Sequence, residues 1–240
     1  ERRSMVMTAE QKEMPAYHEA GHAIVGISLP KCDPVYKATI IPRGGALGMV
    51  MSLPEMDRLN MFRDECHQRL AMTMAGKAAE TLKYGAEAVS NGPAGDIMQA
   101  SQLARAMVLR WGMSDKVGNI DYSEAAEGYQ GNTAGFSVSA NTKEIIEEEV
   151  QAFIQAGFDK AMEIITEKNE EFERLAQGLL EYETLTGEEI QRVIRGEPPN
   201  AGDADDDKKD DGSAPSVTAI PNANRRTPPA SEGPMEPTPT

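Results

Sequence analysis

The sequence is poor in cysteine, in aromatic residues and in long apolar runs. Its two cysteines, Cys32 and Cys66, lie too far apart for a CxxC pair. This excludes a disulfide framework and a cysteine-type zinc finger, and it favours a reducing compartment. The longest apolar run, 23–29, includes a glycine and a serine and is much shorter than the roughly 20 residues that cross a bilayer. We therefore predict no membrane-spanning segment in this sequence.

Basic residues are scarce as well. Lys and Arg number 24 against 39 Asp and Glu, which gives a net charge of −15 over 240 residues. Residues 197–240 hold nine acidic residues and nine of the 15 prolines, without Leu, Phe, Tyr or Trp. We therefore predict a disordered acidic, Pro-rich tail over 197–240 and one folded domain over 1–196. Because the domain is acidic too, nucleic acid is not an expected partner.

Apolar residues recur at helical spacing along most of the domain. Thr8 and Gln11 match a capping box for a first helix reaching about Leu29, in which Pro15 predicts a bend or a separate first turn. Further helices are predicted at 57–83, at 93–111 with Ile97 and Trp111 on its apolar face, at 141–168 with Asn141 or Thr142 as its cap, over 172–180, and after the capping box Thr186–Glu189.

One segment changes period. Residues 35–41 are rich in β-branched and aromatic side chains, a PRGG turn follows, and residues 46–51 can return as a second strand. Residues 112–140 are rich in glycine and polar residues and are expected to form a loop. The predicted fold class is mainly α, a helical domain with a small β-hairpin or edge strand.

Two of the three histidines stand in His18-Glu19-Ala20-Gly21-His22. Chance predicts about 0.004 HExxH matches in a chain of this composition, so the pattern is informative. On a helix, residues i and i+4 share one face, so both imidazoles can bind one Zn²⁺ while Glu19 reaches its water. Gly21 fits a place where something approaches the backbone closely. The motif predicts zinc-assisted peptide hydrolysis with Glu19 as the base.

A catalytic zinc needs a third protein ligand, and the residues alone leave its identity open. No third histidine follows closely, because the sequence after His22 is AIVGISLPK. His67 has charged neighbours and is expected at the surface, whereas Cys66 is expected in the core. Glu80 and Asp96 remain as equal candidates, the former in a stretch of small residues and the latter at the start of a predicted helix.

Several longer motifs occur along the first 195 residues. They are HEAGH at 18–22, PRGGALG at 42–48, LPEMDR at 53–58, GKAAE at 76–80, the aspartate of NGPAGDIMQAS at 91–101, WGMSDKVG at 111–118 and ETLTGEEI at 183–190. In this order they resemble the peptidase domain of the FtsH family, the membrane-anchored, ATP-dependent zinc metalloproteases.

The resemblance implies roles for individual residues. One Zn²⁺ per chain would be held by His18, His22 and Asp96, with Glu19 as catalytic base. Glu80 would match a carboxylate that supports a ligand rather than binding the metal. The strand that pairs with an extended substrate would contain Gly45, Ala46, Leu47, Gly48 and Met49. An ordinary edge strand is the alternative for that segment.

The resemblance also implies partners outside this sequence. The chain begins with Glu1 rather than methionine, which indicates a piece of a longer polypeptide. The family's transmembrane segments and its ATPase module, which uses ATP and Mg²⁺, would precede it, and no GxxxxGK[ST] occurs in these residues. The expected assembly is a homo-hexamer in the bacterial plasma (inner) membrane, with the peptidase domain on the cytoplasmic side, degrading unfolded or membrane proteins. A metal-binding assembly domain of a hexamer that does not cleave is the alternative, which the intact HEAGH disfavours.

Overall fold

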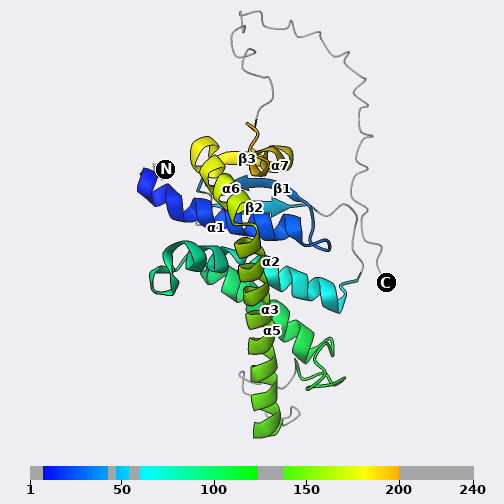
Figure 1. Cartoon of the computed structure of the whole chain (residues 1–240). Helices are drawn as coiled ribbons and strands as arrows, with labels where there is room; N and C mark the ends of the chain where they lie inside the picture. The colour runs from blue at the N-terminus through cyan, green and yellow to red at the C-terminus, as the bar shows by residue number, and fades with distance from the viewer. Residues whose placement is uncertain (1–7, 43–46, 54–59, 124–137, 200–240) are drawn as a thin grey trace, which may run out of the picture. The chain divides into compact units, whose positions relative to one another are not determined.

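The computed structural model describes residues 8–42, 47–53, 60–123 and 138–199. These residues form helices and one small antiparallel sheet (Figure 1), which confirms the mainly α fold class. All of them fall within one compact unit, Glu1–Ala201. In this described part of the chain, no helix combines the length and the apolar character needed to cross a bilayer.

The first helix, α1 (Ala9–Ser28), carries the HExxH motif. Its capping box is the predicted one, because the Thr8 side chain accepts from the Gln11 amide and the Gln11 side chain accepts from the Thr8 amide. Pro15 lies inside a single helix, so the first turns are not a separate element. The motif is thus presented on one continuous helical face.

The sheet has the order β2-β1-β3. Strand β1 (Val35–Thr39) pairs antiparallel with β2 (Met49–Ser52), with Thr39 opposite Met49 and Ala38 opposite Val50. This confirms the predicted hairpin, whose turn at 43–46 lies outside the described residues. Strand β3 (Thr184–Thr186) pairs with the other side of β1 and was not predicted, since three residues between two helices show no strand period. Among the described residues, β2 is therefore an edge strand.

The domain continues with further helical elements: α2 (Arg63–Tyr84), the 3₁₀ turn η1 (Ala86–Ala88), α3 (Ala94–Leu109), α5 (Ala140–Glu167), α6 (Asn169–Tyr182) and α7 (Gly187–Ile194). Helix α2 begins at Arg63, later than predicted, and α5 is capped by Ser139 rather than by Asn141 or Thr142. The capping box Thr186–Glu189 is present as predicted. Most of the predicted loop, 124–137, lies outside the described residues.

Helix α2 lies at the centre of this unit, between α1 on one side and α5 on the other (Figure 1). One buried cluster joins α1, the sheet, α6 and α7 around Tyr17 and Phe172, and it includes alanines of α2 and the C-terminal part of α5. A second joins α2, α3 and α5 around Leu70 and Met107, and it includes the buried Cys66, as predicted. The two clusters fix the position of α2 relative to α1 and α3.

The exposure predicted for His67, and the burial expected for two apolar residues near α3, are wrong. His67 is half-buried rather than solvated, because α5 covers it and its ring lies 4.8 Å from the ring of Phe153. Its burial lowers the pKa of the imidazole. Ile97, predicted on the apolar face of α3, is 40% exposed. Trp111, predicted on the same face, lies beyond the end of α3 at Leu109 and is 42% exposed.

The motif at 111–118 binds a buried carboxylate of α5. Glu149 is buried and accepts a hydrogen bond from the Ser114 hydroxyl at 2.7 Å, and Lys116 Nζ lies 2.7 Å from its other oxygen. The hydrogen bond and charge of Lys116, with help from Ser114, outweigh burial and lower the pKa of Glu149 from its ordinary 4.5. This carboxylate ties the segment after α3 to the long helix.

We expect Glu149→Ala to lower the free energy of unfolding by about 1–3 kcal/mol, because it leaves the buried Ser114 hydroxyl without an acceptor. Since the folded pKa of Glu149 is depressed, its ionic contribution is present above pH 4.5 and is lost as the pH falls through the folded pKa. Urea unfolding at pH 7 and at pH 3 measures both effects. Glu149→Gln keeps an acceptor for Ser114, so it should cost less at pH 7. A wild-type advantage over Glu149→Gln that persists unchanged at pH 3 would contradict the assignment.

Candidate metal centre

His18 and His22 project from the same face of α1. Their Nε2 atoms are 3.2 Å apart. His18 Nδ1 lies 2.9 Å from Glu80 Oε1, and His22 Nδ1 lies 2.8 Å from the carbonyl oxygen of Met72, so each Nδ1–H can donate to α2. These hydrogen bonds fix the tautomer that leaves both Nε2 lone pairs for a metal.

Asp96, in the first turn of α3, adds an oxygen to the two nitrogens. Its Oδ2 lies 3.2 Å from His18 Nε2 and 3.3 Å from His22 Nε2, which closes a nearly equilateral triangle of donor atoms. A tetrahedral ion with bonds of about 2.0 Å has ligand atoms about 3.3 Å apart. Asp96 Oδ2 is also buried without a hydrogen-bond partner. The triangle therefore fits a tetrahedral cation that binds nitrogen and oxygen.

Gly76 on α2 forms the wall beside this triangle. A Cβ atom at position 76 would lie 2.4 Å from His18 Nε2 and 2.6 Å from His22 Nε2, far inside van der Waals contact. Only a residue without a side chain leaves room for both imidazoles. The pattern of the sequence did not single out Gly76, although its place in the small-residue stretch AGKAAE is the signal that points to a close helix contact.

Glu80 lies on the far side of His18 from Asp96. It is 1% exposed, and besides contacting His18 Nδ1 it accepts the Ser90 amide hydrogen at 2.8 Å. Burial raises its pKa, but the hydrogen bonds from His18 and Ser90 outweigh burial and lower it overall. Glu80 is therefore a buried, ionised hydrogen-bond acceptor. The carboxylate contacts a histidine nitrogen that points away from the triangle.

Without a metal, charges inside the triangle stabilise one another. Burial lowers the pKa of His18, but its close contacts with the carboxylates of Asp96 and Glu80 outweigh burial and raise it to about 10. Burial likewise disfavours ionised Asp96, yet its contacts with the two histidines hold its pKa well below the usual range. The donor set is thus an anion facing two imidazoles, and a cation binding there displaces a proton.

Glu19 lies one step round α1 from His18 and is 6% exposed. Burial raises its pKa, although the two histidines and the main-chain amide of Val50 oppose that shift. Its neighbour on the sheet side is Gly48. A buried carboxylate with a raised pKa is suited to accept and return a proton near neutral pH.

The other predicted candidates lie apart from this cluster. Among the described residues, His18, His22 and Asp96 are the one group of acidic, histidine or cysteine side chains close enough to hold a metal. Cys66 and His67 pack in the cluster of α2, α3 and α5. Of the predicted substrate strand, Gly45 and Ala46 lie outside the described residues, Leu47 and Gly48 precede β2, and Met49 begins it.

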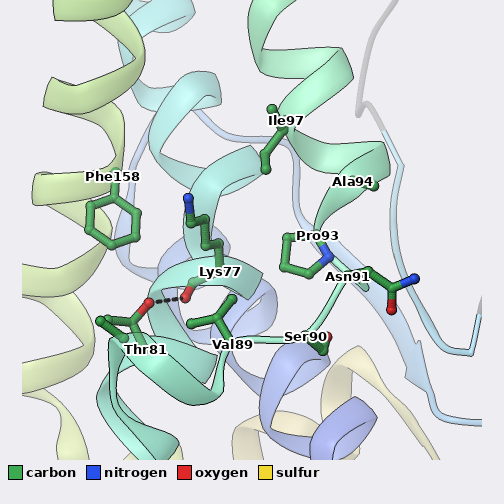
Figure 2. A pocket seen from close by; sticks show the side chains of 10 residues that line it. Lys77, Thr81, Val89, Ser90, Asn91, Pro93, Ala94, Ile97 and Phe158 are labelled. Carbon is green, nitrogen blue, oxygen red and sulfur yellow. Dashed lines mark hydrogen bonds between the residues drawn. The ribbon is translucent and has the colours of Figure 1, made fainter.

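A cavity of about 530 Å³ lies next to the Ser90 segment, whose amide donates to Glu80. Figure 2 shows side chains of α2, the α2–α3 connection, α3 and α5 around it: Lys77, Thr81, Ala86, Val89, Ser90, Asn91, Pro93, Ala94, Ile97 and Phe158. Lys77, which follows Gly76, lines this cavity, and its Nζ lies 5.9 Å from the centre of the Phe158 ring. The residues that line this cavity do not include His18, His22 or Asp96.

The sequence pattern of peptidase family M41 matches residues 5–193 of the chain. The chain belongs to this family. The M41 chain is 47% identical over 195 residues to the ATP-dependent zinc metalloprotease FtsH of Rickettsia bellii, covering 81% of the chain and 31% of that protein. It is 47% identical over 202 residues to FtsH of Caulobacter vibrioides, covering 83% and 32%. The corresponding figures for FtsH 2 of Methylacidiphilum infernorum are 43% over 198 residues, 81% and 31%.

These comparisons confirm the predicted FtsH-family peptidase domain, and with it the prediction of a protease. The M41 chain spans about a third of the length of the relatives it matches. Those relatives are named as ATP-dependent enzymes.

Proposed function

We propose that this M41 domain is a zinc endopeptidase in which His18, His22 and Asp96 hold one Zn²⁺ and Glu19 is the general base. The observation that carries the proposal is the triangle of two imidazole nitrogens and one unpartnered carboxylate oxygen with edges of 3.2–3.3 Å. Three protein ligands leave a fourth position for water or substrate, as catalytic zinc requires.

Each group of the site has a separate role in hydrolysis. Zinc, when bound, would lower the pKa of a water to about 7 and polarise the scissile carbonyl. Glu19 accepts the proton of the attacking water and later donates it to the leaving amine, so its carboxylate is restored at the end of each cycle. Glu80 holds His18 through Nδ1, and the Met72 carbonyl holds His22 in the same way. The imidazoles are therefore oriented before substrate arrives.

An extended peptide is the substrate that the open edge of β2 fits. The Ile40 amide donates to the Glu183 carbonyl on the β3 side of β1, so the main-chain groups of Thr39 face β2 and its partner Met49. The main-chain groups of Gly48 and Val50 therefore face away from β1, where an added strand would pair. Leu47, Met49 and Met51 are 47%, 36% and 38% exposed and provide apolar contacts for unfolded chains.

The wider setting is part of the proposal. The relatives are bacterial enzymes named as ATP-dependent, and the chain covers about a third of their length. We place the domain in a homo-hexamer at the bacterial plasma membrane, on the cytoplasmic side, where an ATPase module using ATP and Mg²⁺ feeds it unfolded or membrane proteins. Residues 1–196 form the peptidase domain in this proposal. The acidic, Pro-rich tail proposed for 197–240 begins with ordered residues, because Glu197 and Pro198 contact Arg195 and Arg192, and its composition predicts disorder beyond them.

Glu19→Gln tests the proposed function. We expect the variant to keep about one zinc per chain and to lose peptide hydrolysis by about 10²–10⁴-fold, because the amide cannot accept the proton. Elemental analysis and cleavage of an unstructured casein peptide measure the two quantities on the same samples. Glu87→Gln, at an exposed carboxylate in η1, is the matched control and should change neither.

Two outcomes would contradict the proposal. Unchanged hydrolysis in Glu19→Gln would remove Glu19 from the role of base. Wild-type protein that holds zinc and cleaves no peptide, even as part of the longer polypeptide, would instead identify the metal-binding assembly domain of a hexamer.

A further inference from the structure

The backbone just before β2 touches the carboxylate of Glu19. A Cβ atom at Gly48 would lie 2.5 Å from Glu19 Oε1, 2.7 Å from its Cγ and 2.9 Å from its Cδ. Three atoms of one side chain thus occupy the space that any other residue at position 48 would fill. Because both the end and the stem of Glu19 are involved, a small rotation of the carboxylate does not relieve the overlap.

A second main-chain group of the same short segment lies near the carboxylate. The Val50 amide is close enough to Glu19 to oppose the rise in its pKa, and Val50 is two residues from Gly48. Glu19 is 6% exposed and is therefore enclosed between its own helix, α1, and the start of β2.

We propose that Gly48 is a positioning residue for the base. Its missing side chain lets the β2 segment close on Glu19, so that Val50 and the Gly48 backbone fix the carboxylate in one orientation. The inference rests on the proposed function, in which Glu19 takes the proton. The inference adds that one strand segment has two roles. The segment before β2 sets the position of Glu19, and the edge of β2 places a paired peptide next to it.

The first test is Gly48→Ala in the zinc-loaded chain. We expect kcat for casein-peptide cleavage to fall by about 100-fold, the effect of displacing a reacting group by about 1 Å. KM should change little, and zinc should stay at one per chain, since the atoms nearest to a Cβ at position 48 all belong to Glu19 and not to the three ligands. Gly95→Ala is the matched control, because a Cβ there meets nothing within 4 Å. Met49→Ala, at an exposed strand position, should raise KM and leave kcat unchanged.

A double-mutant cycle separates positioning of the base from damage to the strand. Aspartate at position 19 is one methylene shorter and leaves space for an alanine at 48. Glu19→Asp alone lowers kcat, but in that background Gly48→Ala should cost less than about 10-fold, because coupled residues are not additive. If Gly48→Ala alone does not fold, recovery of folding in the double variant supports the same contact. Strict additivity would overturn the inference.

Crystal structures of wild type and Gly48→Ala provide a readout that does not depend on activity. We expect the Glu19 carboxylate to move by about 1 Å or more, while His18, His22 and Asp96 keep their places. A carboxylate that does not move would overturn the inference, whatever the kinetics. Failure of wild type to bind zinc or cleave peptide would refute the proposed function and leave this comparison able to decide the role of Gly48.

Discussion

Asp96→Asn is expected to remove zinc from the site and to abolish peptide hydrolysis with it. The buried Oδ2 of Asp96 is the negatively charged corner of the donor triangle. A neutral amide removes the charge that stabilises the cation between two imidazoles. Loss of a group that merely supports a ligand costs about 10–100-fold in metal affinity, so loss of the ligand should cost more.

Elemental analysis after dialysis against buffer with trace zinc measures this effect. Wild type should retain about one zinc per chain and Asp96→Asn well under half of that. Asp121→Asn, at an exposed aspartate, is the control and should match wild type. If Asp96→Asn keeps its zinc, Asp96 is not a ligand, and Glu80, the other carboxylate that contacts His18, becomes the better candidate.

Much of the fold could be predicted because local rules decide it. The capping boxes at Thr8 and Thr186 and the apolar periods of α2, α3 and α5 are encoded within a few residues. Strand β3 could not be predicted in this way, since its pairing with β1 joins residues nearly 150 positions apart. His67 was misplaced for a similar reason, because the cover over it comes from Phe153 on α5.

The residues of the site also differ in how far the sequence predicts them. His18, Glu19 and His22 are adjacent on one helix, so their spacing alone predicts a shared face. Asp96 and Glu80 come from other helices, and composition and spacing left them equal; the family resemblance was needed to favour Asp96 as a ligand. Tertiary structure separates their surroundings, with Asp96 against both Nε2 atoms and Glu80 against one Nδ1.

Glycine roles are the hardest to predict, because what matters is a side chain that is missing. Position 76 looks like one more small residue in a helix until the imidazoles of α1 are placed against it. Position 48 looks like a turn residue until Glu19 is placed beneath it. In both cases the partner lies on α1, and sequence distance conceals the contact.

Gly76→Ala should therefore abolish metal binding in a chain that still folds. The added methyl group would overlap the His18 and His22 nitrogens at 2.4–2.6 Å, so the imidazoles or α2 must move and the triangle is lost. Overpacking of this kind also costs about 1–3 kcal/mol of stability. The control must reproduce that cost away from the metal. Gly157→Ala does so, because its Cβ would crowd the opposite side of α2 at Leu70, at 2.9–3.0 Å.

Zinc content and thermal unfolding with and without a chelator distinguish the two variants. A ligand that binds only the folded state stabilises it, so chelation should lower the Tm of wild type and of Gly157→Ala. Gly76→Ala should hold no zinc, and its Tm should not respond to the chelator. One zinc per chain in Gly76→Ala would show that the histidines can bind metal from another arrangement. The close approach of α1 to α2 would then serve packing alone, and the geometry of the triangle would no longer depend on a glycine at position 76.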